Sequence, residues 1–148
     1  MLFNKQAMML FQRWLKTTCN RPQLDKVTGE EMTIDISDAA VAKLKELKSK
    51  YTDSKIVRLQ VDGGGCHGLS LSFSLSDRKD IDSEGDVEFT ETTSGVSIVT
   101  DSISLPYITG STVDYTDTLM RQAFTLTNNP QAGSQCGCGT SFDIQKKK

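Results

Sequence analysis

The sequence predicts a β-rich α+β domain with one long helix and one short helix. Apolar residues recur at helical spacing between Ser37 and Tyr51, and they alternate with polar residues in several segments between Ile56 and Leu126. The chain has 148 residues and no internal repeat, which favours one domain. Its apolar content of 36% is low, so we expect a working core with little surplus.

The long helix is predicted after a short strand or lead-in at Thr33–Asp35. Ser37 precedes it, and a serine side chain there accepts a hydrogen bond from a free backbone N–H of the first turn. One face of this helix is apolar and the other faces carry lysines, which predicts a helix lying on a sheet. The apolar face comprises Ala40, Val41, Leu44, Leu47 and Tyr51.

The clearest strands are 56–62 and 69–76, because apolar and polar residues alternate along both. The connection Asp77–Gly85 is charged and is expected to be exposed, with solvated carboxylates at Asp80, Asp82, Glu84 and Asp86. Further strands are predicted around Val87 and Phe89, over 96–100, around Val113 and Tyr115, and around Phe124 and Leu126. A short helix capped by Asp101 or Ser102 is expected to reach Ile108, with its length limited by Pro106.

The N-terminus differs from the rest of the chain. Its first 24 residues hold four of the 17 lysines and arginines and none of the 19 acidic residues, and its apolar side chains fall largely on one helical face. This composition predicts a mitochondrial transit peptide, assigned to residues 1–31. A surface helix packed on the domain is the alternative. The remainder is acidic, which argues against nucleic-acid binding, and no apolar run is long enough to span a membrane.

Three of the four cysteines lie among glycines. Cys66 follows three glycines, and Cys136 and Cys138 flank Gly137. Thiolates are preferred ligands of soft metals and iron–sulfur clusters, and the central glycine relieves the tight spacing of the second pair. Because Cys19 belongs to the predicted leader, an odd number of cysteines remains, which favours metal-binding thiols in a reducing compartment.

The motif Gly-Gly-Cys-His-Gly at 64–68, followed by Cys-Gly-Cys-Gly-Thr-Ser-Phe at 136–142, resembles the A-type (HesB-like) iron–sulfur cluster assembly proteins. The resemblance runs from about Met32 to Ile144 and includes Val99–Ser102 and Gly110–Tyr115. The segment Asn128–Ala132 is most similar to the mitochondrial type 2 branch. His67 departs from the family, which usually has serine there.

This resemblance implies a compact β-sandwich-like domain at 32–144 with a flexible, cysteine-containing C-terminal tail, and it leaves 145–148 as a lysine tail. It implies a carrier or scaffold, not an enzyme, that binds iron or a cluster, either [2Fe–2S] or [4Fe–4S], through Cys66, Cys136 and Cys138. The expected partners are cluster donors, apoprotein recipients, and a second copy or a related A-type protein in a dimer. The expected location is the mitochondrial matrix, and the type 2 branch implies a role in [4Fe–4S] maturation.

Ligand counting leaves one coordination position open, because such clusters normally take four thiolates. Either two chains share one cluster or another group completes the set. His67 is a candidate, but adjacent residues on an extended backbone point to opposite sides, so Cys66 and His67 are not expected to bind one metal atom together.

Two other functions fit parts of the pattern. The first is a zinc-binding structural or interaction domain that uses Cys66, His67, Cys136 and Cys138 as a Cys3His site. The second is a thiol redox protein that uses the Cys-Gly-Cys pair. Catalysis by a nucleophile and base has little support, because the single histidine lies beside Cys66 and adjacency disfavours their convergence.

Overall fold

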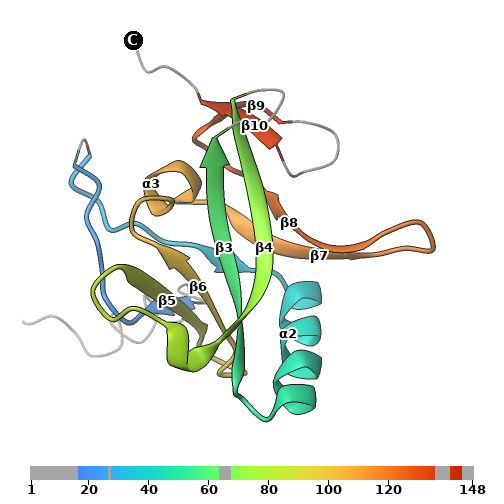
Figure 1. Cartoon of the computed structure of the whole chain (residues 1–148). Coiled ribbons are helices and arrows are strands. Elements are labelled where there is room, and N and C mark those ends of the chain that lie inside the picture. The colour runs from blue at the N-terminus through green and yellow to red at the C-terminus, as the bar shows by residue number, and fades with distance from the viewer. Residues whose placement is uncertain (1–16, 27, 64–67, 136–140, 145–148) are drawn as a thin grey trace, which may run out of the picture.

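The computed structural model describes residues 17–26, 28–63, 68–135 and 141–144. Its strands form two sheets (Figure 1). The larger sheet has seven strands in the order β1-β5-β6-β3-β4-β10-β9, and the smaller has three in the order β2-β7-β8. The strands are β1 (Thr17–Cys19), β2 (Asp35–Ile36), β3 (Lys55–Gly63), β4 (Leu69–Asp77), β5 (Asp86–Glu91), β6 (Ser97–Asp101), β7 (Thr112–Asp117), β8 (Gln122–Thr127), β9 (Ala132–Gln135) and β10 (Ser141–Ile144).

The long helix α2 (Asp38–Tyr51) begins where the sequence predicts. Ser37 caps it, with its Oγ accepting a hydrogen bond from the Ala40 N–H at 3.2 Å. Ala40 and Leu44 are buried, and Val41 and Leu47 pack beside them on the core, so the apolar face of the helix is the one that covers the sheets.

The predicted short helix is α3 (Leu105–Ile108), which contains Pro106 in its first turn. It starts a few residues later than expected. A turn formed by Asp101 and Ser104 precedes it, in which the Asp101 carboxylate accepts hydrogen bonds from both the backbone N–H and the hydroxyl of Ser104. A single 3-10 turn, η1 (Arg78–Asp80), interrupts the connection between β4 and β5.

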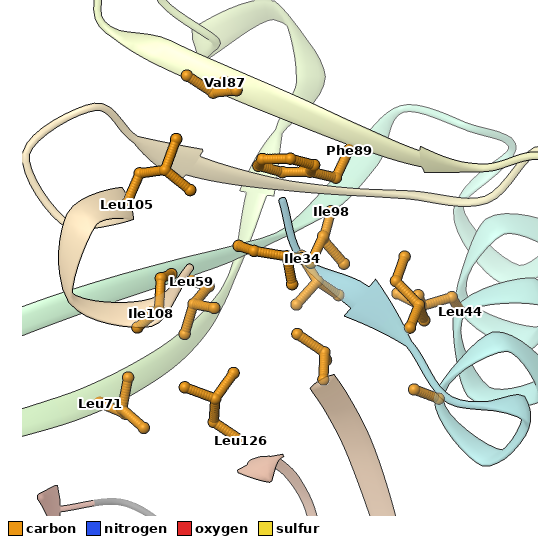
Figure 2. Close-up of a cluster of buried hydrophobic side chains, with 14 of the residues drawn as sticks. Ile34, Leu44, Leu59, Leu71, Val87, Phe89, Ile98, Leu105, Ile108 and Leu126 are labelled. Atoms are coloured by element: carbon orange, nitrogen blue, oxygen red, sulfur yellow. The ribbon is translucent and has the colours of Figure 1, made fainter. Parts of the chain in front are cut away.

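The core lies where the two sheets and the helices meet. Figure 2 shows its side chains, which come from β3, β4, β5, β6, β8, α2 and α3. Leu59, Phe89, Ile98 and Val113 are each at most 1% exposed. This arrangement confirms the predicted β-rich α+β fold.

The C-terminal segment differs from the expected tail in one respect. No strand after Leu126 was predicted from the sequence, yet β9 and β10 pair with each other and β10 pairs with β4. The free edge of β4 explains the difference, because an unpaired row of backbone groups accepts another strand with little regard for side chains.

Candidate functional site

The β3–β4 hairpin positions the first of the predicted cysteine segments. Its two strands pair in unbroken antiparallel register from Lys55↔Asp77 to Gly63↔Leu69. The alternating apolar residues of both strands set this register, because a slip by one residue would move every apolar side chain to the opposite face. Residues 64–67 follow directly at the end of the hairpin. Gly68, which directly precedes β4, has a φ of +95°, a conformation that favours glycine.

The second segment starts from the same part of the sheet. Leu69 on β4 pairs with Phe142 on β10, and Phe142 pairs in turn with Gln135 on β9. Together with the Gly63↔Leu69 pair, these contacts form one row across four neighbouring strands. At about 4.8 Å per strand, the row is about 14 Å wide. Figure 1 shows the ends of β3, β4, β9 and β10 gathered at one end of the molecule.

The strands at the two ends of this row run in opposite directions, because each pair within the row is antiparallel. The chain therefore leaves Gly63 on one side of the row and Gln135 on the other. Cys66, His67, Cys136 and Cys138 themselves lie outside the described residues. The structure brings together the backbone that flanks the cysteine segments and leaves the proposed ligand set a prediction.

Two serine side chains of β4 bind Asp62 near the end of β3. The Ser72 hydroxyl donates to a carboxylate oxygen of Asp62 at 3.1 Å, and the Ser70 hydroxyl donates to the Asp62 backbone carbonyl at 3.4 Å. The predicted polar face of β4 thus stabilises the strand end next to the cysteine segment.

A second contact, which the sequence did not predict, anchors the same strand from the other side. The Val61 N–H donates to the Ser104 hydroxyl at 3.0 Å, and that hydroxyl donates to Asp101 at 2.7 Å. Ser104 is only 3% exposed, and both hydrogen bonds are partly buried. It connects the end of β3 to the turn between β6 and α3.

The residues around this site match known proteins. The model of the family described as "Iron-sulphur cluster biosynthesis" matches residues 32–140. This chain belongs to that family.

Individual relatives agree with this assignment. "Iron-sulfur cluster assembly 2 homolog, mitochondrial" of Mus musculus is 36% identical over 92% of this chain and 79% of its own length. "Iron-sulfur cluster insertion protein ErpA" of Haemophilus influenzae is 40% identical over 75% of this chain and 93% of its own. "Iron-sulfur assembly protein 2" of Schizosaccharomyces pombe is 36% identical over 79% of this chain, and the match spans 55% of that longer protein.

Two solved structures share the fold. The crystal structure of IscA with the [2Fe-2S] cluster superposes with a TM-score of 0.59 at 26% identity, over 78% of this chain and all of that one. The crystal structure of Escherichia coli SufA superposes with a TM-score of 0.57 at 30% identity, over 75% of this chain and 92% of that one.

The range matched by the iron–sulfur cluster biosynthesis family contains Cys66, Cys136 and Cys138 but not Cys19. Cys19 lies on β1, at the opposite edge of the seven-stranded sheet from β9. Burial raises the pKa of its thiol and so favours the protonated form, which is a poor metal ligand.

Within the described residues, no group of three or more His, Cys, Asp or Glu side chains is placed to hold a metal ion.

One expectation about the acidic connection is wrong. Asp86 was expected to be solvated with its neighbours, but it is only 6% exposed, and the Arg58 guanidinium binds its carboxylate. Asp86 is the first residue of β5, and its carboxylate lies between Arg58 of the sheet and the Asp82 N–H of the preceding connection, which donates to it.

Proposed function

We propose that this protein carries iron or an iron–sulfur cluster on Cys66, Cys136 and Cys138 and transfers it to apoproteins. The observation that carries the proposal is the row from Gly63 to Gln135, from which both cysteine segments depart. Cys136 directly follows Gln135, and Cys66 is three residues from Gly63, a reach of at most about 11 Å. Membership of the iron–sulfur cluster biosynthesis family supports the same function. We propose a carrier and not an enzyme.

The ligand count favours a cluster shared between two chains. Four thiolates normally hold a cluster, and one chain offers three within the family-matched range. The opposite directions of β3 and β9 add to this argument, because convergence within one chain requires a segment to turn back across the row. A second copy, or a related A-type protein, supplies the missing ligand in our proposal.

The cargo is proposed from the relatives. The IscA structure was solved with a [2Fe-2S] cluster, so a cluster of this type fits the shared fold. The sequence resemblance to the type 2 branch favours a role in supplying [4Fe–4S] clusters. In our proposal the same thiolates bind either type of cluster or mononuclear iron. The partners are cluster donors and apoprotein recipients.

We also propose the mitochondrial matrix as the location. The name of the mouse relative includes the word mitochondrial, and the acid-free basic N-terminus has the composition of a transit peptide. The leader fused to a fluorescent reporter should enter mitochondria, and a fusion with Lys5, Arg13 and Lys16 replaced by glutamine should not. A cytosolic reporter in both cases would contradict this location. Within the described residues, no helix is both long and apolar enough to cross a bilayer.

Anaerobic reconstitution with iron and sulfide tests the function. The protein should develop the visible absorbance of an iron–sulfur cluster and lose it when an apoprotein acceptor is added, as the acceptor gains activity. A colourless protein with stoichiometric zinc would instead support the Cys3His alternative with His67. Matched reactions with a Cys66→Ser variant separate bound cluster from iron sulfide in solution.

A further inference from the structure

The strand β1 lies outside the family-matched range, yet it is part of the large sheet. It pairs antiparallel with β5 through Thr17↔Glu91, Thr18↔Thr90 and Cys19↔Phe89. β1 is the outermost strand on this side, so without it β5 would form the edge of the sheet. Figure 1 shows the strand, in blue, beside β5.

Side-chain hydrogen bonds extend this pairing. Thr17 is 5% exposed, and its hydroxyl donates to the Ile34 carbonyl at 2.6 Å. The Asn20 N–H donates to the Glu88 carbonyl at 3.0 Å, and the Asn20 side-chain oxygen accepts from the Glu88 N–H at 2.9 Å. Backbone groups at the edge of β5 are therefore satisfied by this segment.

The residues that follow are also tied to the domain. The Arg21 guanidinium donates to the Ser83 carbonyl at 2.8 Å and to the Glu84 carbonyl. The chain then reverses direction, so that Leu24 and Glu31 form an antiparallel bridge and the Met32 N–H donates to the Gln23 carbonyl at 2.8 Å. These contacts hold the segment against the β4–β5 connection and against the first residues of the family domain.

The core continues beneath β1. Cys19 packs against the buried cluster opposite Phe89, which is only 1% exposed. Removal of the segment would expose this part of the core and leave the outer N–H and C=O groups of β5 unpaired. An exposed strand edge is a template for association with other strands.

We infer that residues 17–31 are a retained part of the folded protein, and that proteolytic removal of the leader ends before Thr17. The claim about where the leader is cleaved rests on the proposed mitochondrial import. β1 then closes the β5 edge of the mature domain, and the boundary of the leader lies well before the start of the family-matched range at Met32.

Two truncated proteins test the structural role without import. A chain that starts at Thr17 should keep the thermal midpoint of the full chain, whereas one that starts at Met32 should lose more than about 5 °C and form larger species in light scattering. Equal midpoints for the two truncated proteins would overturn the inference.

Point variants of the full chain test the role of this segment even if the chain that starts at Met32 does not fold. Asn20→Ala should speed hydrogen exchange at the Glu88 amide, because that N–H loses its acceptor. Lys26→Ala, which alters an exposed residue of the same segment, should not change it. Unchanged exchange at Glu88 in Asn20→Ala would contradict the role of β1.

The mature N-terminus, measured by mass spectrometry on protein from mitochondria, tests the processing limit. A start at or before Thr17 supports the inference, and a start between Thr18 and Met32 overturns it. Failure of import would contradict the proposed location, while the truncated proteins still decide the role of β1.

Discussion

Arg58 on β3 reaches across β6 and binds Asp86 on β5 with two hydrogen bonds, Nη1 to Oδ1 at 2.8 Å and Nη2 to Oδ2 at 2.6 Å. The same carboxylate accepts from the Asp82 N–H at 2.9 Å. The ion pair is mostly buried, with 14% of the Arg58 and 7% of the Asp86 side chain exposed. It links β3 to β5 across β6, and the sequence does not place β3 beside β6.

This pair predicts an acid-sensitive contribution to stability. The Arg58 guanidinium holds the pKa of Asp86 below its ordinary value of 3.8. A depressed pKa in the folded state stabilises the fold above the unfolded pKa and loses that stabilisation as the pH falls through the folded value. Asp86→Asn should therefore lower the free energy of unfolding by about 2 kcal/mol at pH 7, a smaller loss than for an ion pair fully removed from water. Below about pH 4 the same substitution should lower the free energy of unfolding by a smaller amount.

Denaturant unfolding at several pH values measures this difference. Asp77→Asn is the matched control, because Asp77 pairs with Lys55 at 2.7 Å but both side chains are about one-third exposed (32% and 37%). Its effect should be smaller, since water screens the pair. Equal effects of the two substitutions would contradict the importance assigned to burial.

The proposed ligand set predicts which substitutions reduce the bound cluster and which do not. Cys66→Ser, Cys136→Ser and Cys138→Ser should each reduce the cluster absorbance after anaerobic reconstitution, because each removes a thiolate. Cys19→Ser should not, since Cys19 lies at the far edge of the sheet. His67→Ser should leave the absorbance nearly unchanged, and a loss as complete as that of Cys66→Ser would make His67 a ligand.

A shared cluster predicts a change of assembly on loading. Cluster-loaded protein should migrate as a dimer or larger species with less than one cluster per chain, because three thiolates leave one position open. Size exclusion with light scattering, together with iron and sulfide analysis, measures both quantities. A stable monomer that retains one intact cluster would refute the sharing.

Metal removal should leave the domain folded. The described residues of the buried core lie between Met32 and Leu126, on helices, strands and the segments that lead into β2 and β6. None of the predicted thiolates belongs to these elements, because Cys66 falls between β3 and β4 in the sequence and Cys136 and Cys138 follow β9. At roughly 1.5–3 kcal/mol for each large apolar side chain fully buried, this core should not depend on metal, unlike that of a small zinc domain. After exhaustive chelation, circular dichroism should still show a cooperative thermal transition.

Hydrogen exchange gives the finer test of the same point. After chelation, faster exchange should be confined to residues 63–68 and to those from Gln131 onward. Melting of β3 and β5 on chelation would contradict a carrier and favour a structural zinc site.

The sequence determined the elements whose signals are local. Ser37 lies before an apolar face at helical spacing, so the cap and face of α2 were predictable. The alternation along β3 and β4 restricts their pairing, because a slip by one residue would turn the apolar side chains to the opposite face. The glycine-flanked cysteines were likewise recognisable from their spacing alone.

Only the tertiary structure decided the pairings between distant segments. Asp86 has the same local composition as its solvated neighbours, and what distinguishes it is Arg58, 28 residues earlier in the chain. The strands β1, β9 and β10 have weak local patterns and form because β5 and β4 offer free edges. Backbone hydrogen bonding at an edge depends little on side chains, so a single sequence carries almost no signal for it.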